Sequence, residues 1–235
     1  MRDWLLYIRF AFRYAWENDT LRHVKHFQRW YKDTRSGGSA LDRELPWMTY
    51  DAIDFLGSIC TPGSVVFEWG SGGSTLFLAK RCRHVTSVEH DSKWSGYLRE
   101  RLETLGVDNV DYKEIPGEKI ADWEARDYRN PDDFVSGDKG SVGLSFERYV
   151  KAIDPFPGGS FDIVVVDGRV RNGCVKRAIP HVKRGGYLVV DNSERAYYLE
   201  GAPELQDTAV WEKQEFQGPI FFQHAFSRTS FFKKR

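Results

Sequence analysis

Acidic and amide side chains that could bind a ligand or accept a proton directly follow four apolar runs of this sequence. They are Glu68, Glu89, Asp167 and the pair Asp191-Asn192. Each run is typical of a strand buried in a parallel sheet. Because the carboxyl ends of parallel strands meet at one edge, where open α/β sheets bind their ligands, these side chains should gather there. So many carboxylates at one edge are unfavourable without a ligand or metal, so the sequence predicts a binding site.

A glycine-rich turn connects the first of these acids to a helix. The cofactor-binding residues that we expect here are Glu68, Gly70, Ser71, Gly72, Gly73 and Ser74. Glycine permits backbone angles that a Cβ forbids and lets a ligand lie against the main chain. The order differs from the G-x-G-x-x-G of dinucleotide-binding folds, because the sixth position is Thr75.

A second acid, Glu89, followed by His90, ends the next strand about twenty residues on. A carboxylate at this position can accept hydrogen bonds from both hydroxyls of an adenosine ribose, and we expect both residues to contact the cofactor. Enzymes that bind NAD also use an acid at this position to bind the ribose hydroxyls. A solvated turn residue is the alternative explanation for Glu89.

The order acid-x-Gly-x-Gly-x-small at residues 68–74 resembles motif I of the class I S-adenosyl-L-methionine-dependent methyltransferases. The resemblance covers about residues 46–235. It implies a Rossmann-like α/β fold, with a doubly wound, seven-stranded, mostly parallel sheet, and S-adenosyl-L-methionine as the cofactor. It also places Asp167 beside that cofactor.

Asp167 and Asp191-Asn192 resemble the magnesium ligands of the catechol O-methyltransferase-like group. Two carboxylates and an amide oxygen suit a hard ion, and such an ion would lower the pKa of an acceptor hydroxyl and orient it. That group carries a lysine three residues beyond the first Asp, where this chain has Val170. Two explanations therefore stay open. Either Mg²⁺ binds here, or Asp167 is the general base and Asp191 caps the following helix.

Three arginines, Arg169, Arg171 and Arg195, follow the acids closely. Guanidinium groups bind carboxylate and phosphate well, so we expect a small, hydroxylated, acidic acceptor. The pattern around them resembles bacterial methyltransferases of glycan and secondary-metabolite pathways, which makes a glycan or secondary metabolite the expected acceptor class. The alternative is that the arginines neutralise the acids. Asp167, Arg169 and His224 are the candidate catalytic residues, and His224 could serve as a base near neutral pH.

The expected reaction is O-methylation by in-line displacement, in which positioning of the reactants supplies much of the rate. An NAD-linked oxidoreductase would share the fold but not the glycine spacing. A non-catalytic binding module would keep the fold without the cofactor. A nucleic-acid methyltransferase would carry an Asn/Asp-Pro-Pro-Tyr type of motif for a flipped base, and residues 167–170 read Asp-Gly-Arg-Val instead.

Composition limits the class of protein. A chain of 235 residues is long enough for one α/β domain with an appendage. The 34 basic and 34 acidic residues balance, so no nucleic-acid partner is expected. Three scattered cysteines fit reduced thiols in a cytoplasmic protein. No run approaches the roughly 18 apolar residues of a membrane span.

The chain divides into a helical extension, residues 1–45, and a methyltransferase domain, residues 46–235, with a lid-like insertion at 116–159. The segment 4–16 is rich in aromatic residues and carries Arg9 and Arg13 on one helical face. It resembles a helix that lies on anionic lipid, which would make the protein membrane-peripheral. The alternative is packing on the domain or on a second copy in a homodimer.

Overall fold

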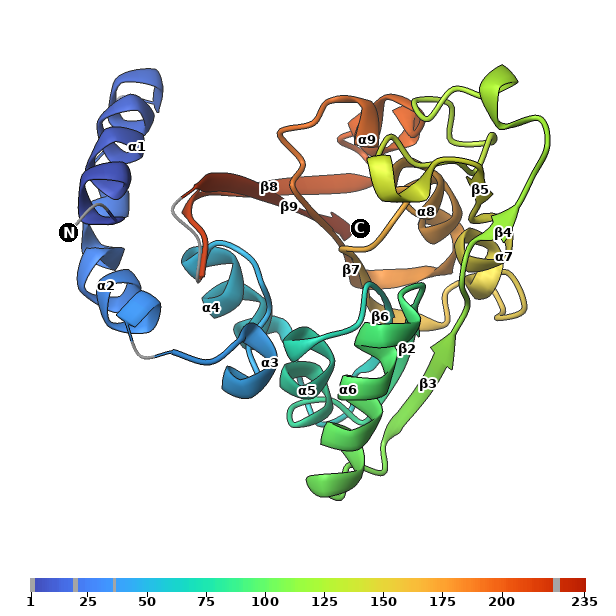
Figure 1. Cartoon of the computed structure of the whole chain (residues 1–235), viewed down its shortest axis with the longest axis horizontal. Coiled ribbons are helices and arrows are strands. Elements are labelled where there is room, and N and C mark those ends of the chain that lie inside the picture. The colour runs from blue at the N-terminus through green and yellow to red at the C-terminus, as the bar shows by residue number, and fades with distance from the viewer. Residues whose placement is uncertain (1–2, 19–20, 36, 222–224) are drawn as a thin grey trace.

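The computed structural model describes residues 3–18, 21–35, 37–221 and 225–235. Its centre is a seven-stranded sheet with the order β3-β2-β1-β6-β7-β9-β8 (Figure 1). The strands are β1 (Val65–Trp69), β2 (His84–Glu89), β3 (Val110–Glu114), β6 (Phe161–Val166), β7 (Val182–Asp191), β8 (Trp211–Pro219) and β9 (Phe226–Lys234). All neighbours are parallel except β9, which runs antiparallel to β7 and β8. The predicted fold class is thereby confirmed.

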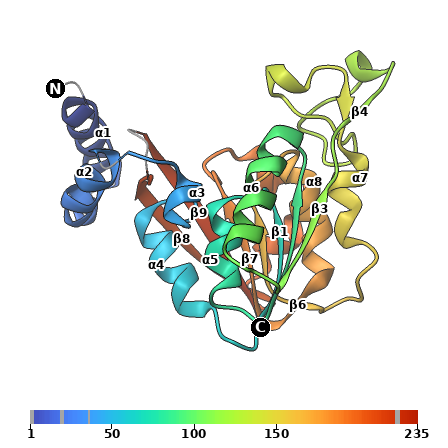
Figure 2. The same ribbon diagram turned by 60° about the horizontal axis from the view of Figure 1, so that its bottom comes forward.

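Helices cover both faces of the sheet (Figure 2). They are α3 (Ala40–Arg43), α4 (Tyr50–Ile59), α5 (Gly73–Ala79), α6 (Ser92–Thr104), α7 (Glu147–Val150), α8 (Arg171–Ala178) and α9 (Tyr197–Glu200). Alternate residues of β6 enter different cores, because successive side chains of a strand point to opposite faces. Ile163 and Val165 pack with α4 and α5, while Val164 and Val166 pack with α7 and α8. This double burial explains the continuous apolar run of β6.

The insertion between β3 and β6 is tied to the end of β1. Its strands β4 (Glu118–Lys119) and β5 (Leu144–Ser145) form an antiparallel pair, and α7 follows them. Phe146 and Tyr149 are buried in the core on the α8 side of the sheet. The indole Nε1 of Trp69 donates a hydrogen bond of 2.9 Å to the carbonyl oxygen of Tyr149. The insertion is therefore anchored beside the sheet edge at which β1 ends.

The N-terminal helices α1 (Asp3–Asn18) and α2 (Phe27–Arg35) lie beyond the hairpin end of β8 and β9 (Figure 1). The rings of Tyr7 and Trp30 pack with centroids 4.4 Å apart, and Tyr7 also contacts Phe226. The predicted N-terminal helix is confirmed. Its outer face exposes Phe12 and Trp16, at 74% and 91% of their surface. In the described part of the chain, no helix has the length and apolar character needed to cross a membrane.

Candidate functional site

The acids predicted to share an edge do so. Main-chain hydrogen bonds join the ends of the neighbouring strands β2, β1 and β6, from Gly70 N to Val88 O at 3.0 Å and from Asp167 N to Trp69 O at 2.9 Å. The strand order turns outward in both directions from the pair β1 and β6, and this switch point is where open α/β sheets bind ligands. The strand ends are therefore arranged as the predicted binding site at this edge requires.

The turn after β1 is pressed against the turn after β6. Gly70 has a φ of +93°, and a Cβ on it would lie 2.7 Å from the carbonyl carbon of Asp167. The next glycine, Gly72, faces the indole of Trp94, whose Nε1 donates to Ser71 O at 2.7 Å. Only glycine suits the first position, because both its φ and its surroundings exclude a side chain. The turn is therefore a compact main-chain cradle.

Gly73 has a different reason to be glycine. A Cβ there would lie 2.3 Å from the carbonyl oxygens of Ala40 and Leu45, so this position begins α5 in direct contact with the segment that includes α3. The ion pairs of Glu44 with Lys80 and Arg101 fasten the same segment. The close main-chain packing explains this glycine without any ligand.

Glu89 is fixed by the backbone around it. Its Oε2 accepts from Ser71 N at 2.9 Å, and its Oε1 accepts from His90 N and Asp91 N, each at 2.8 Å. The side chain is almost fully buried. A carboxylate held in this way keeps one orientation and retains acceptor capacity on Oε2. Its position beside the glycine turn suits a ligand hydroxyl such as those of a ribose.

Glu68 lies at the bottom of the same turn and is fully buried. Its Oε2 accepts from Thr75 Oγ1 at 2.6 Å and from Ser87 Oγ at 2.7 Å. Among the described residues its Oε1 has no hydrogen-bond partner. Burial raises the pKa of Glu68, against the lowering effect of these hydroxyl donors. A buried carboxyl oxygen without a partner suits a cationic ligand, and S-adenosyl-L-methionine carries an ammonium and a sulfonium group.

We expect Glu68→Gln to raise the free energy of unfolding near pH 8 and to change it little near pH 4. Below the ordinary pKa of 4.5, the carboxyl is protonated in both the folded and the unfolded state. As the pH rises, the unfolded state ionises while the buried carboxyl resists, so the wild type loses stability that the variant keeps. Urea denaturation at both pH values measures the difference, and a gain independent of pH would contradict the raised pKa.

Arg171 lies between the two acids that were predicted to hold magnesium. Its Nη2 is 2.8 Å from Asp167 Oδ1, and its Nη1 is 3.5 Å from Asp191 Oδ2. Asn192 instead donates from Nδ2 to Ser227 Oγ at 2.8 Å. No cluster of three His, Cys, Asp or Glu side chains with metal-ligand spacing occurs within the described ranges. The described residues thus do not present the predicted Mg²⁺ site of Asp167, Asp191 and Asn192 in an open form, because a guanidinium group lies between the two carboxylates.

The prediction that Asp191 caps the next helix is also wrong. Its Oδ1 accepts from Thr229 Oγ1 of β9 at 2.7 Å, and α9 begins only at Tyr197. Burial raises the pKa of Asp167 well above its usual value, and the neighbouring carboxylates of Asp191 and Glu68 raise it further against the effect of Arg171. A raised pKa makes the ionised carboxylate a stronger base than an ordinary one, so Asp167 keeps its candidacy as a base.

Arg169 crosses from the end of β6 toward the end of β2. Its Nε donates to His90 Nε2 at 3.1 Å, while His90 Nδ1 lies 2.7 Å from Glu89 Oε1. Its Nη2 lies 3.4 Å from Asp138 Oδ2 of the insertion. The interaction with Arg169 makes Nε2 an acceptor and so leaves the ring proton on Nδ1. Four side chains thus connect the predicted ribose acid to the insertion.

A pocket of about 490 Å³ opens beside this chain of contacts, over the ends of β6 and β7. Charged and aromatic side chains line it, principally Arg169, Arg171, Arg195, Tyr128, Tyr197 and Tyr198. The three arginines were predicted to lie together, and they do. The sequence analysis missed Tyr128 and Tyr197, and the doublet Tyr197-Tyr198 two positions after Arg195 was the available signal. His224, the third catalytic candidate, lies outside the described residues.

The three arginines differ in how their charge is balanced. Arg171 pairs with Asp167 and Asp191, and Arg169 pairs with Asp138. Arg195 donates from Nη1 to Tyr198 Oη at 2.7 Å. Within the described part of the chain, no ion pair joins it to a carboxylate. The prediction of neutralised arginines thus describes Arg171, and Arg195 is available to a ligand.

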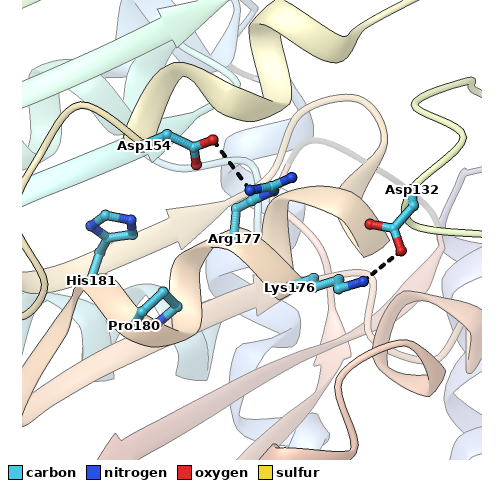
Figure 3. A pocket seen from close by; sticks show the side chains of 6 residues that line it. All are labelled: Asp132, Asp154, Lys176, Arg177, Pro180 and His181. Carbon is cyan, nitrogen blue, oxygen red and sulfur yellow. Dashed lines mark hydrogen bonds and ion pairs between the residues drawn. The ribbon is translucent and has the colours of Figure 1, made fainter.

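A second hollow, of about 350 Å³, lies along the outer side of α8 (Figure 3). Its charged groups form two ion pairs, Lys176 with Asp132 and Arg177 with Asp154. It includes none of the strand-end acids. The candidate acceptor site is therefore the pocket over β6 and β7, which lies beside the strand ends.

The strand order, the glycine turn and the acid after β2 together define the fold of the class I S-adenosyl-L-methionine-dependent methyltransferases. Solved structures share it. An O-methyltransferase from Bacillus cereus in complex with S-adenosylhomocysteine is 13% identical, with 88% of this chain and 96% of that chain aligned at a TM-score of 0.59. An rRNA methylase from Streptococcus thermophilus is 17% identical, with 77% and 92% aligned at 0.50.

A precorrin-6y C5,15-methyltransferase from Geobacter metallireducens is 12% identical, with 83% of this chain and 96% of that chain aligned at a TM-score of 0.51. No protein-family model and no curated protein sequence matches the chain. The names of these three proteins indicate different kinds of methyl transfer on one fold, and at these identities the likeness establishes the fold alone.

Proposed function

We propose that the chain is an S-adenosyl-L-methionine-dependent methyltransferase that methylates an oxygen of a small, hydroxylated, acidic acceptor, such as a glycan or secondary metabolite. The observation that carries the proposal is the pairing of the Gly70 cradle with the fixed carboxylate of Glu89 at the switch point of the sheet. The partnerless oxygen of Glu68 adds a place for a cationic group. The Bacillus cereus O-methyltransferase, which shares this fold, binds S-adenosylhomocysteine.

Different parts of the site would bind the cofactor and the acceptor. Glu89 would hold the ribose, and Glu68 would face the positive end of the cofactor, which supplies an electrophilic methyl group when bound. The pocket over β6 and β7 would hold the acceptor, and the Asp167 carboxyl pairs with Arg171, which lines that pocket. Asp167 would take the proton from the acceptor hydroxyl. Alignment of the two reactants would lower the activation barrier by several kcal/mol.

Glu89→Ala should weaken S-adenosylhomocysteine binding about 100-fold, because hydrogen bonds to a charged group contribute about 1.5–3 kcal/mol each. Calorimetric titration with S-adenosylhomocysteine and, separately, with NAD measures this in the wild type and the variant. Glu100→Ala, an exposed acid on α6, is the matched control and should bind as the wild type does. Binding of NAD alone would favour an oxidoreductase, and binding of neither would favour a non-catalytic module.

Arg195→Ala should raise the KM for an acidic acceptor about 10- to 100-fold and leave S-adenosylhomocysteine binding unchanged, because its uncompensated charge lies in the acceptor pocket. Methyl transfer from labelled cofactor to uronic acids, sugar phosphates and hydroxylated aromatic acids, each beside its neutral counterpart, measures the effect. Arg184→Ala, an exposed arginine on β7, is the control. Equal rates with acidic and neutral acceptors would contradict an acidic substrate.

Contact of α1 with anionic lipid or with a second copy of the chain stays a prediction. The exposed rings of Phe12 and Trp16 supply an apolar face for either partner.

A further inference from the structure

Arg171 is surrounded by oxygen atoms. Its Nε donates to Gly168 O at 3.0 Å, its Nη2 to Asp167 O at 2.8 Å, and its Nη1 to Asp191 O at 2.6 Å. The carboxylates of Asp167 and Asp191 complete the set. Three carbonyl oxygens and two carboxylates form the kind of oxygen-rich shell that hard cations occupy in proteins. Here each nitrogen of the guanidinium group makes at least one of these contacts.

The backbone is bent to place this side chain. Val170, the residue before it, has a φ of +48°, and Asn192 at the end of β7 has a φ of +53°. A β-branched residue in the left-handed region is an unfavourable conformation that the surrounding structure must stabilise. The bend comes directly before α8, which begins at Arg171. Arg171 thereby occupies the first turn of α8 and reaches back to both strand ends.

Arg171 also lines the acceptor pocket. Its side chain is 12% exposed, with the ring of Tyr198 5.5 Å from its guanidinium carbon. A single fixed positive charge between Asp167 and Asp191 limits their mutual repulsion. It also links β6 to β7 at the pocket wall. Both tasks are those that a bound divalent ion performs between two acids.

We propose that the guanidinium group of Arg171 is the cation that this edge of the sheet binds, in the place predicted for magnesium. Arg171 would then be a positioning residue that fixes Asp167 and Asp191 relative to each other. The role in positioning Asp167 for catalysis rests on the proposed methyltransferase function. The occupation of the cation site does not. Removal of the guanidinium group should therefore convert an arginine site into a metal site.

Mn²⁺ titration followed by electron paramagnetic resonance, together with thermal melting, tests the proposal on the full chain. The wild type should bind no Mn²⁺ at this edge, and a chelator should leave its Tm unchanged. Arg171→Ala should gain one Mn²⁺ site at least tenfold tighter than any wild-type binding, and Mn²⁺ should raise its Tm. Adding Asp191→Asn to that variant should abolish the new site. Arg177→Ala removes an arginine of the same helix that pairs with Asp154, and should gain nothing.

A folded Arg171→Ala that gains no Mn²⁺ site would overturn the proposal, and so would a wild type whose Tm falls with chelator and recovers with Mn²⁺. If Arg171→Ala does not fold, Arg171→Lys, which keeps a positive charge, takes its place in the experiment. That variant should bind no Mn²⁺, and a site in it that Asp191→Asn removes would overturn the proposal. None of these measurements uses the methyl donor, so loss of S-adenosylhomocysteine binding would affect only the proposed function.

Discussion

Gly70→Ala should lower the affinity for S-adenosylhomocysteine at least 100-fold and reduce the free energy of unfolding by about 3 kcal/mol. An alanine at a φ of +93° costs about 1–2 kcal/mol in backbone energy alone. Its Cβ would also lie 2.7 Å from Gly168 N, so the turns after β1 and β6 would have to separate. Calorimetry with S-adenosylhomocysteine and urea denaturation measure the two effects.

The control for this substitution is Gly96→Ala. Gly96 lies in the exposed middle of α6, and a Cβ there would have nothing within 4 Å. Alanine should stabilise the helix by about 0.5–1 kcal/mol and leave ligand binding intact. If Gly70→Ala binds S-adenosylhomocysteine as the wild type does, the turn after β1 is not the cofactor cradle.

Gly168→Ala should be comparably severe, with a loss of about 3 kcal/mol or more. Its Cβ would lie 1.8 Å from Tyr149 Oη, and Tyr149 is a fully buried residue of α7. In the described part of the chain, this hydroxyl has no hydrogen-bond partner, so Tyr149→Phe alone should change stability little. In the double variant Gly168→Ala/Tyr149→Phe, loss of the hydroxyl should relieve part of the clash with the new Cβ.

A double-mutant cycle of these two positions should therefore give a coupling of at least about 1 kcal/mol, with the double variant more stable than the sum of the single changes predicts. Urea denaturation of the four proteins measures it. Additive losses would show that the clash arises elsewhere, and a large loss in Tyr149→Phe would show that the hydroxyl has a structural partner after all.

The sequence predicted the sheet and its acids well because both follow from local patterns. The strands β1, β2 and β6 each have an acid at or directly after the carboxyl end, and parallel strands must bring those ends together. Neither step needs knowledge of distant contacts. The pocket arginines were placed together for the same reason, since Arg169, Arg171 and Arg195 all follow strand ends.

The partners of the acids could not be predicted, because they depend on backbone angles and on contacts far apart in sequence. The left-handed Val170 directs Arg171 toward Asp191, twenty positions later, and no motif signals that bend. Thr229 reaches Asp191 from β9 across 38 positions. The insertion supplies Tyr149 and Asp138 in the same way, and its irregular composition gave only its position in the chain.

The position of β9 in the sheet also affects how the molecule can assemble. β9 comes last in chain order, yet it lies between β7 and β8 and hydrogen-bonds to both. Until residues 226–234 have joined, β7 is an open edge of apolar residues, and unpaired edges of this kind associate with other chains. This pairing is long-range in sequence and therefore slow to form. Correct assembly thus depends on how quickly β9 reaches β7, relative to encounters between partly folded copies.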